Sequence, residues 1–232
     1  MIPGDPNVQR VELVAAALGE LRHQLVLVGG SAVSLLIDSA TASPPRVTYD
    51  VDLIAEVAAL REYHLVEKAL AERGFVRDQA PDAPICRWTV GAVKVDLMPT
   101  SEAVLGFSNP WYKEAMRSAT RCTLPSGVAL NLISAPAFLA TKFEAFDSRG
   151  RGDMAASHDF EDIINIVEGC STLVADVRAA APALRTYVVQ RLAAIEADEG
   201  FRNTLPGLIT PDELHAERVK TVLARLADLT AL

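Results

Sequence analysis

Three aspartates stand where carboxylates can do chemistry, and two of them are close neighbours in the chain. Asp50 and Asp52 lie in residues 48–54, where polar and apolar residues alternate as in a half-buried β-strand. Residues two apart project from the same face of a strand, so these two carboxylates are expected side by side. Like charges repel unless a cation lies between them, and Mg²⁺ is commonly held by one or two carboxylates together with substrate phosphates. The pair therefore predicts metal-dependent phosphate chemistry, with a solvated strand face as the alternative.

The third carboxylate, Asp96, lies in a predicted β-hairpin. Residues 93–98 alternate in polarity, and they follow residues 85–90 across a short glycine-containing turn. If this hairpin pairs beside the strand that carries the first two aspartates, all three carboxylates converge on one end of the sheet. Asp96 would then share a metal ion or accept a proton. The alternative is an ordinary strand charge that pairs with Lys94 or Arg87.

A glycine turn precedes the first two aspartates. Gly29, Gly30 and Ser31 follow the apolar residues 25–28, and a short helix is expected over residues 31–37. Such a turn lets a phosphate approach backbone N–H groups, and the positive end of the following helix favours an anion. We therefore expect these three residues to contact nucleotide phosphates, although glycines also serve ordinary turns.

The order of these features resembles the nucleotidyltransferase superfold of DNA polymerase beta, tRNA-terminal transferases and aminoglycoside nucleotidyltransferases. That pattern is Gly-Gly or Gly-Ser after an apolar residue, then Asp-x-Asp, then a later Asp between apolar residues, and it covers roughly residues 25–100. The resemblance implies an α/β (α+β) fold in which a mixed β-sheet with flanking helices is followed by a C-terminal helical domain. It also implies that Asp50, Asp52 and Asp96 hold Mg²⁺, or Mn²⁺, while an NMP moves from an NTP to an acceptor.

Residues 46–52 point to one group of enzymes within this superfold. They are similar to the Arg-x-Thr-x-Asp-x-Asp pattern of AbiEii-type bacterial nucleotidyltransferases, some of which are toxins of toxin–antitoxin systems. The similarity implies that Arg46 and Thr48 bind nucleotide, although Arg46 is equally suited to loop solvation. It also implies a tRNA or protein acceptor and an antitoxin protein as partner.

The same family has a Lys-x-x-Ala helix, an Arg-Gly turn and a later helix that starts with acidic residues. Lys142, Arg149 and residues 157–163 occupy corresponding places, but His158 stands where a lysine is usual. The resemblance implies that Lys142 binds the triphosphate, whereas a surface lysine is the alternative. Carboxylates at the start of the later helix would also be stabilised by its dipole alone.

The segment before Arg46 is longer than is usual for the superfold. Ser43-Pro44-Pro45 predicts an exposed loop, either a tolerated insertion or a flap that contacts substrate.

After residue 134 nearly every pattern is helical, so we expect a catalytic domain over residues 1–133 and a helical domain over residues 134–232. Helices are expected over residues 8–21, 31–37, 59–73, 159–167, 172–180, 183–196 and 211–229, with a further one starting at Pro136.

Composition limits the class of protein. The chain has 232 residues, 50% of them hydrophobic, and can bury one large core or two modest ones. It has no apolar run as long as a membrane span and no signal-peptide pattern, so no membrane association is expected. The three cysteines are scattered, which predicts free thiols in a reducing cytoplasm.

Charge bears on the acceptor. The formal net charge is −8 and no Lys/Arg run occurs, whereas proteins that grip RNA usually show a basic patch. This balance favours a small molecule or a protein hydroxyl over tRNA, without deciding among them.

Two alternatives to a nucleotidyltransferase make different demands on the sequence. A non-catalytic nucleotide-binding or regulatory module would be favoured by loss of an aspartate, and none is lost. A dinucleotide-binding enzyme needs Gly-x-Gly-x-x-Gly and repeated strand–helix units, which the residues after Val28 do not supply.

Overall fold

The computed structural model describes residues 4–150 and 152–232, and it confirms a mixed α/β architecture with C-terminal helices. Contacts divide the chain into two compact units. Within the described residues, the sheet unit comprises residues 4–35 and 46–134, and the helical unit comprises residues 36–45, 135–150 and 152–232. The functional division into two domains stays a prediction.

The sheet unit is built on a mixed sheet, which has seven strands within the described residues, in the order β3-β4-β5-β2-β1-β7-β6. The strands are β1 (Leu25–Val28), β2 (Asp50–Ala55), β3 (Val76–Arg77), β4 (Arg87–Val90), β5 (Val93–Pro99), β6 (Thr120–Thr123) and β7 (Ala129–Leu132). β2 runs antiparallel to β1 and parallel to β5, so the predicted hairpin of β4 and β5 does pair beside the Asp50 strand.

Helices pack against this sheet. They are α1 (Pro6–Leu18), the 3₁₀ turn η1 (Gly19–His23), α2 (Gly29–Leu36), α3 (Leu60–Ala71), α4 (Glu102–Leu105) and α5 (Tyr112–Arg117). α1, α2 and α3 confirm predicted helices. α4 and α5 were not predicted, because so few residues give no readable helical period. α3 ends where Gly74 adopts a positive φ of 83°, the left-handed conformation expected of a glycine after a helix.

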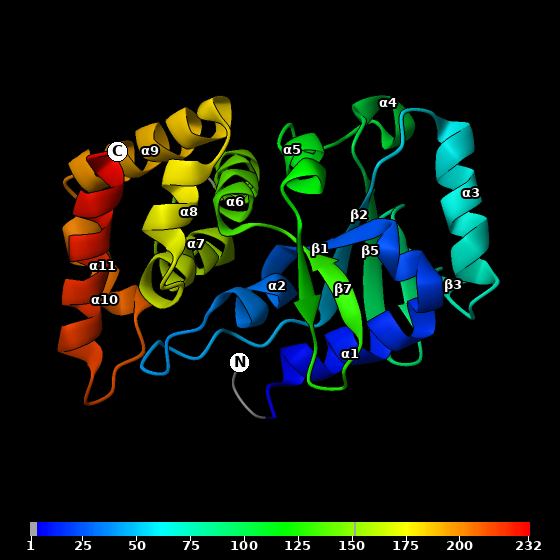
Figure 1. Ribbon diagram of the computed structural model, residues 1–232, viewed down its shortest axis with the longest axis horizontal. Helices are drawn as coiled ribbons and strands as arrows, with labels where there is room; N and C mark the ends of the chain where they lie inside the picture. The colour runs from blue at the N-terminus through cyan, green and yellow to red at the C-terminus, as the bar shows by residue number, and fades with distance from the viewer. Residues whose placement is uncertain (1–3, 151) are drawn as a thin grey trace. The chain divides into compact units, whose positions relative to one another are not determined.

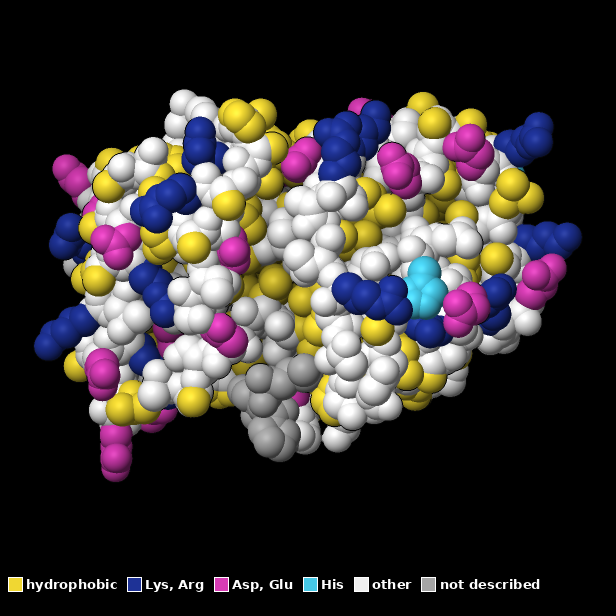
Figure 2. Space-filling model, in the orientation of Figure 1, with side chains coloured by type: hydrophobic (Ala, Val, Ile, Leu, Met, Phe, Trp, Pro, Cys, Tyr) yellow, Lys and Arg dark blue, Asp and Glu magenta, His cyan; other side chains and the backbone are white. Residues whose placement is uncertain are grey.

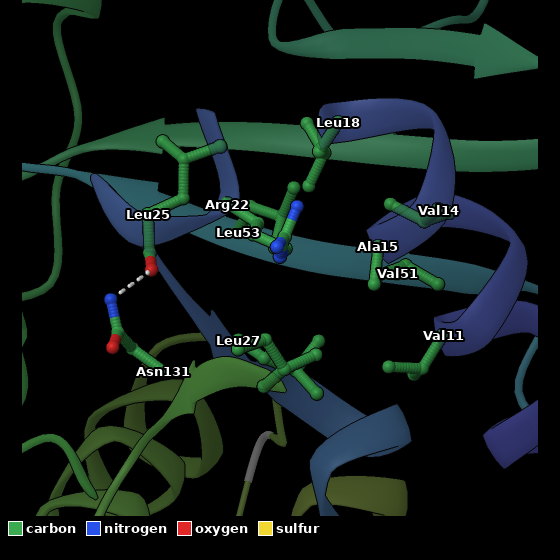
Figure 3. A pocket seen from close by; sticks show the side chains of 11 residues that line it. Val11, Val14, Ala15, Leu18, Arg22, Leu25, Leu27, Val51, Leu53 and Asn131 are labelled. Carbon is green, nitrogen blue, oxygen red and sulfur yellow. Dashed lines mark hydrogen bonds between the residues drawn. The ribbon is translucent and has the colours of Figure 1, made fainter. Parts of the chain in front are cut away.

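α1 lies across one face of the sheet (Figure 1). Its Val11 and Val14 side chains line a small apolar cavity together with Val51 and Leu53 of β2 (Figure 3). Val51 and Leu53 alternate with the aspartates along β2, so this cavity lies on the sheet face opposite to the carboxylates. It belongs to the core rather than to the predicted site.

The helical unit contains α6 (Ala135–Arg149), α7 (His158–Gly169), α8 (Leu173–Ala179), α9 (Pro182–Ala197), α10 (Phe201–Leu208) and α11 (His215–Thr230). Buried aromatic rings from three of these helices meet, with the Phe160 ring centroid 5.2 Å from that of Phe146 and 6.3 Å from that of Phe201. α10 was not predicted, because Pro206 and Gly207 interrupt its pattern. None of the described helices has the length and apolar character that crossing a membrane requires.

The predicted exposed loop before Arg46 is wrong in part. Residues 36–45 pack with the helical unit, and Ser43 is buried, while Pro44 is exposed. The Ser43 backbone N–H donates to Glu168 at 2.6 Å, and the Arg218 guanidinium donates to the Thr41 carbonyl at 2.6 Å. These partners lie more than a hundred residues away, so no local sequence signal could identify them.

We expect Gly169→Ala to destabilise the helical unit. A Cβ at this position would lie 2.8 Å from two side-chain carbons of Ile37 and 3.1 Å from Ala42. The free energy of unfolding should fall by about 1–3 kcal/mol, the usual effect of overpacking. The control is Gly207→Ala in α10, where an added Cβ has no neighbour within 4 Å and should stabilise the helix by about 0.5–1 kcal/mol. Thermal unfolding measures both, and equal effects of the two variants would contradict the packing argument.

Candidate functional site

The three aspartates share one face of the sheet unit. In the parallel register of β2 and β5, Asp52 lies opposite Asp96 and Asp50 lies opposite Lys94. Because side chains alternate along both strands, the three carboxylates project to the same side. The Asp50 side chain is 39% exposed, whereas that of Asp96 is 11% exposed. The sheet therefore brings together the three carboxylates that the sequence singles out.

Arg87 of β4 neutralises part of this acidic face. It lies opposite Asp96 in the antiparallel register, and its guanidinium donates to both Asp96 oxygens, from Nε at 2.8 Å and from Nη2 at 2.7 Å. The same Nη2 lies 3.4 Å from Asp50 Oδ2. Hydrogen bonding to Asp96 raises the pKa of Arg87 above its ordinary value, so the guanidinium stays charged. The pairing of Asp96 with Arg87, which the sequence left open as an alternative, is therefore present.

This pairing limits how the face would hold a metal ion. In residues 4–150 and 152–232, no group of three or more His, Cys, Asp or Glu side chains is arranged to hold a metal. Both Asp96 oxygens accept hydrogen bonds from Arg87, and Asp50 and Asp52 are the other two carboxylates of this face. Two carboxylates suit Mg²⁺ when substrate phosphates complete its coordination, so the donor set fits a metal that arrives with nucleotide.

The glycine turn packs directly against Asp52. Gly29 has a φ of 68°, and a Cβ there would lie 1.8 Å from Asp52 Oδ2, so only glycine fits between the strand and the start of α2. Ser31 is buried in the first turn of α2, and its hydroxyl has no hydrogen-bond partner in the described structure. Early N–H groups of a helix also lack intrahelical partners. An acidic strand end and a donor-rich helix N-terminus thus adjoin each other.

Asn7, which the sequence analysis missed, fixes the segment that leads into β2. Its side chain is fully buried and donates to Ser34 Oγ at 3.1 Å and to the Arg46 carbonyl at 2.9 Å. Its carbonyl oxygen accepts from the Thr48 backbone N–H at 2.8 Å. The Thr48 hydroxyl is turned inward, 3.3 Å from the same oxygen. Asn7 therefore holds the backbone of Arg46 and Thr48 against α2, and its position at a helix start gives no hint of this role.

Lys142 is buried in the helical unit, so the alternative of a surface lysine is wrong. Its Nζ lies 3.0 Å from Asp159 Oδ1 and 2.6 Å from Asp162 Oδ2. Burial lowers the pKa of Lys142, but the charges of Asp162 and Asp159 outweigh this effect and raise it above its ordinary value. Asp159 and Asp162, considered in the sequence as helix-start carboxylates, are thus partners of a buried cation.

Arg149 completes this cluster from the end of α6. Its Nε donates to Asp159 Oδ2 at 2.7 Å and its Nη2 donates to Asp159 Oδ1 at 2.9 Å. Burial alone would raise the pKa of Asp159, but the hydrogen bonds from Arg149 and the charge of Lys142 lower it to about 2. Lys142, Arg149 and the start of α7, the three places that resemble AbiEii-type enzymes in the second half of the chain, therefore meet within the helical unit.

No family model matches this chain, and no curated protein matches it. Among solved structures, it is similar to the solution structure of the antibiotic-resistance factor ANT(2'')-Ia, with 18% identity and a TM-score of 0.48 over 82% of this chain and 94% of that one. It is also similar to the crystal structure of ANT(2'')-Ia in complex with adenylyl-2''-tobramycin, with 20% identity and a TM-score of 0.48 over 79% of this chain and 97% of that one.

We expect Asn7→Ala to destabilise the sheet unit. The substitution leaves the Thr48 N–H, the Arg46 carbonyl and the Ser34 hydroxyl without their buried partner. The free energy of unfolding in urea should fall by about 2–4 kcal/mol, because buried polar groups without partners are costly. The control is Asn203→Ala on the exposed side of α10, which should change stability by no more than about 0.5 kcal/mol. Wild-type stability of Asn7→Ala would refute this role.

We expect acid to weaken the helical unit through Asp159. Its pKa is about 2 in the folded protein against an ordinary value of 3.8, so its stabilisation is complete above pH 3.8 and is lost as the pH falls through about 2. Asp159→Asn should lower the free energy of unfolding at pH 7 by about 2–3 kcal/mol. Between pH 4 and pH 2, the variant should lose less stability than wild type does, because it lacks the carboxylate that titrates there. Asp147→Asn, which removes an exposed pair with Arg191, is the control and should change stability at pH 7 by at most about 1 kcal/mol. Equal acid dependence of Asp159→Asn and wild type would contradict the assignment.

Proposed function

We propose that this protein is a metal-dependent nucleotidyltransferase that moves an NMP from an NTP to a hydroxyl group of an acceptor. The observation that carries the proposal is the contact of the Asp52 carboxylate with Gly29 at the start of α2, on the face that Asp52 shares with Asp50 and Asp96. A helix N-terminus attracts phosphate, and the adjoining carboxylates attract the metal ion that accompanies a nucleotide. The two halves of a metal–nucleotide site are therefore adjacent.

Each predicted residue has a role in this proposal. Gly29 and Gly30 offer backbone N–H groups to the β- and γ-phosphates, and the Ser31 hydroxyl, buried without a partner in the described structure, adds a donor. Asp50 and Asp52 would hold Mg²⁺, or Mn²⁺, which when bound neutralises charge on the triphosphate.

The segment 46–48 enters the proposal as the resemblance to AbiEii-type enzymes implies, with Arg46 and Thr48 as nucleotide-binding residues. Since Asn7 accepts from the Thr48 backbone and holds the Arg46 carbonyl, Thr48 acts here by fixing the backbone in front of Asp50. Arg46 is the member whose long side chain suits a phosphate.

The transfer itself is an in-line displacement. The acceptor oxygen bonds to the α-phosphorus, the bond from that phosphorus to the bridging oxygen breaks, and pyrophosphate leaves with the electron pair. Asp96 takes the proton of the acceptor hydroxyl. Each of its oxygens accepts a hydrogen bond from the Arg87 guanidinium, which lowers the basicity of the carboxylate, so release of one oxygen by Arg87 would favour the proton transfer.

Lys142 remains a proposed triphosphate ligand, as the resemblance implies, but its ammonium group already has two carboxylate partners. An ammonium has three N–H donors, and Asp159 and Asp162 each lie within hydrogen-bond distance of it. A phosphate would therefore take the remaining donor, or would replace one of the two carboxylates.

Two observations bear on the acceptor and favour different classes. The AbiEii-type resemblance favours a tRNA or a protein, and with it a toxin restrained by an antitoxin protein in the cytoplasm. The net charge of −8 favours a small hydroxylated molecule, and acidic side chains are interspersed among the basic ones on the face shown in Figure 2. A tRNA acceptor would give an affinity that falls steeply with salt, because phosphate contacts release counterions.

We expect Asp50→Asn and Asp52→Asn to reduce Mg²⁺-dependent turnover of NTP by at least about a hundredfold, because each removes charge from a proposed metal ligand. The fold should stay intact, and the melting temperature should be equal or higher, because one of two repelling carboxylates is lost. The control is Asp82→Asn on an exposed loop of the same unit, which should keep wild-type turnover.

The assay follows each labelled NTP with Mg²⁺ in the presence of tRNA, aminoglycosides or a protein lysate. Unchanged turnover in the Asp50→Asn/Asp52→Asn double variant would refute the catalytic assignment. Nucleotide binding by calorimetry without transfer to any acceptor would favour the second candidate, a non-catalytic nucleotide-binding module.

A further inference from the structure

We propose that Arg87 is a built-in counter-cation of the aspartate face, which competes with a divalent metal ion for Asp50 and so weakens metal binding when no nucleotide is present. The inference deepens the proposed function and rests on it, because it concerns the same carboxylates. It also gives a role to Arg87, which belongs neither to the superfold pattern nor to the AbiEii-type pattern.

The first support is the geometry of the guanidinium. Nε and Nη2 of Arg87 form a fork on Asp96 at 2.8 and 2.7 Å, and Nη2 also reaches Asp50 Oδ2 at 3.4 Å. A single charged group thus bridges carboxylates from β5 and β2. Paired guanidinium–carboxylate contacts of this kind are among the stronger hydrogen bonds in proteins.

The second support is burial. The side chains of Arg87 and Asp96 are only 17% and 11% exposed, so water screens their pairing weakly, whereas Asp50 is 39% exposed. Asp96 therefore anchors the guanidinium, and Asp50 is the member of the set that solvent and ions can reach. The fork on Asp96 keeps the positive charge of Arg87 next to the proposed metal ligand.

The consequence is competition at Asp50. A metal ion bound to this carboxylate would lie within a few ångströms of the guanidinium, and like charges at that range repel strongly when partly shielded from water. Metal binding and the Arg87–Asp50 contact are therefore opposed. A metal that arrives with a triphosphate brings negative charge with it and largely avoids this repulsion.

Lys94 supplies a matched control. It lies on the same face, opposite Asp50 in the register of β2 and β5, and carries the same charge. Its side chain is exposed, and within residues 4–150 and 152–232 it makes no ion pair. Removing the Lys94 charge tests whether any positive charge on this face weakens metal binding, or whether the direct contact of Arg87 with Asp50 is needed.

The experiment titrates Mn²⁺ alone into the nucleotide-free full-length protein and measures free Mn²⁺ by electron paramagnetic resonance. Arg87→Gln should bind Mn²⁺ about tenfold or more tightly than wild type, the scale expected when a charge-assisted contact no longer competes. Lys94→Gln should stay within about threefold of wild type, because exposed charges are screened. Adding Asp50→Asn to Arg87→Gln should remove the gain.

Unchanged or weaker Mn²⁺ binding by Arg87→Gln would overturn the proposal, and so would an equal gain in Lys94→Gln. Arg87→Met keeps the length and packing of the side chain and serves as a second variant. Loss of the helical circular-dichroism signal in both variants would assign Arg87 to folding and also overturn the proposal.

These outcomes are separate from those of the proposed function. Wild-type transfer activity together with unchanged Mn²⁺ affinity in Arg87→Gln would refute the counter-cation alone. Tighter Mn²⁺ binding in Arg87→Gln without any NTP binding or transfer by wild type would refute the nucleotidyltransferase assignment and leave the counter-cation in place.

Discussion

The parallel pairing of β2 with β5 is the constraint on which the site depends. It sets Asp52 directly opposite Asp96 and places Asp50 on the same face, so three carboxylates are held together by backbone hydrogen bonds that do not depend on their charge. The repulsion among them has to be offset by cations. Arg87, which β4 places opposite Asp96, offsets part of it within the protein itself. The same geometry that makes the face suitable for a metal ion therefore also supplies a competitor for it.

The two faces of the sheet are used differently. On one face, Val51 and Leu53 pack under α1 and hold β2 in the core, while the aspartates that alternate with them stay on the other face. Such a strand cannot slip by one residue without burying carboxylates and exposing its apolar side chains, so its register is strongly fixed. Asn7 adds a second constraint just before the strand, where its buried amide holds Thr48. The position of Asp50 is thus determined from both sides.

The helical unit holds a cluster of charged side chains in its interior. Lys142 lies between Asp159 and Asp162, and Arg149 closes the cluster from outside. Buried charges are tolerated only when they are paired, and removing one partner leaves the others unbalanced. The cluster ties α6 to α7 whether or not Lys142 also binds nucleotide. A role in the fold and a role at a phosphate are compatible for a lysine, because its ammonium has three donors.

The strand and hairpin that carry the aspartates, the glycine turn and the helical second half were predictable from the sequence, because they depend on local periodicity and turn chemistry. Period-two alternation in β2 and β5 was enough to place the three carboxylates on one face once the hairpin paired beside β2. Three features became clear from the folded chain alone: Asp96 pairs with Arg87, Ser43 is buried, and Lys142 lies between two carboxylates. The Asp96 pairing needs the cross-strand register, and the Ser43 contact needs a partner 125 residues away. Which charged group meets which is set by packing across such distances, and a linear pattern does not contain that information.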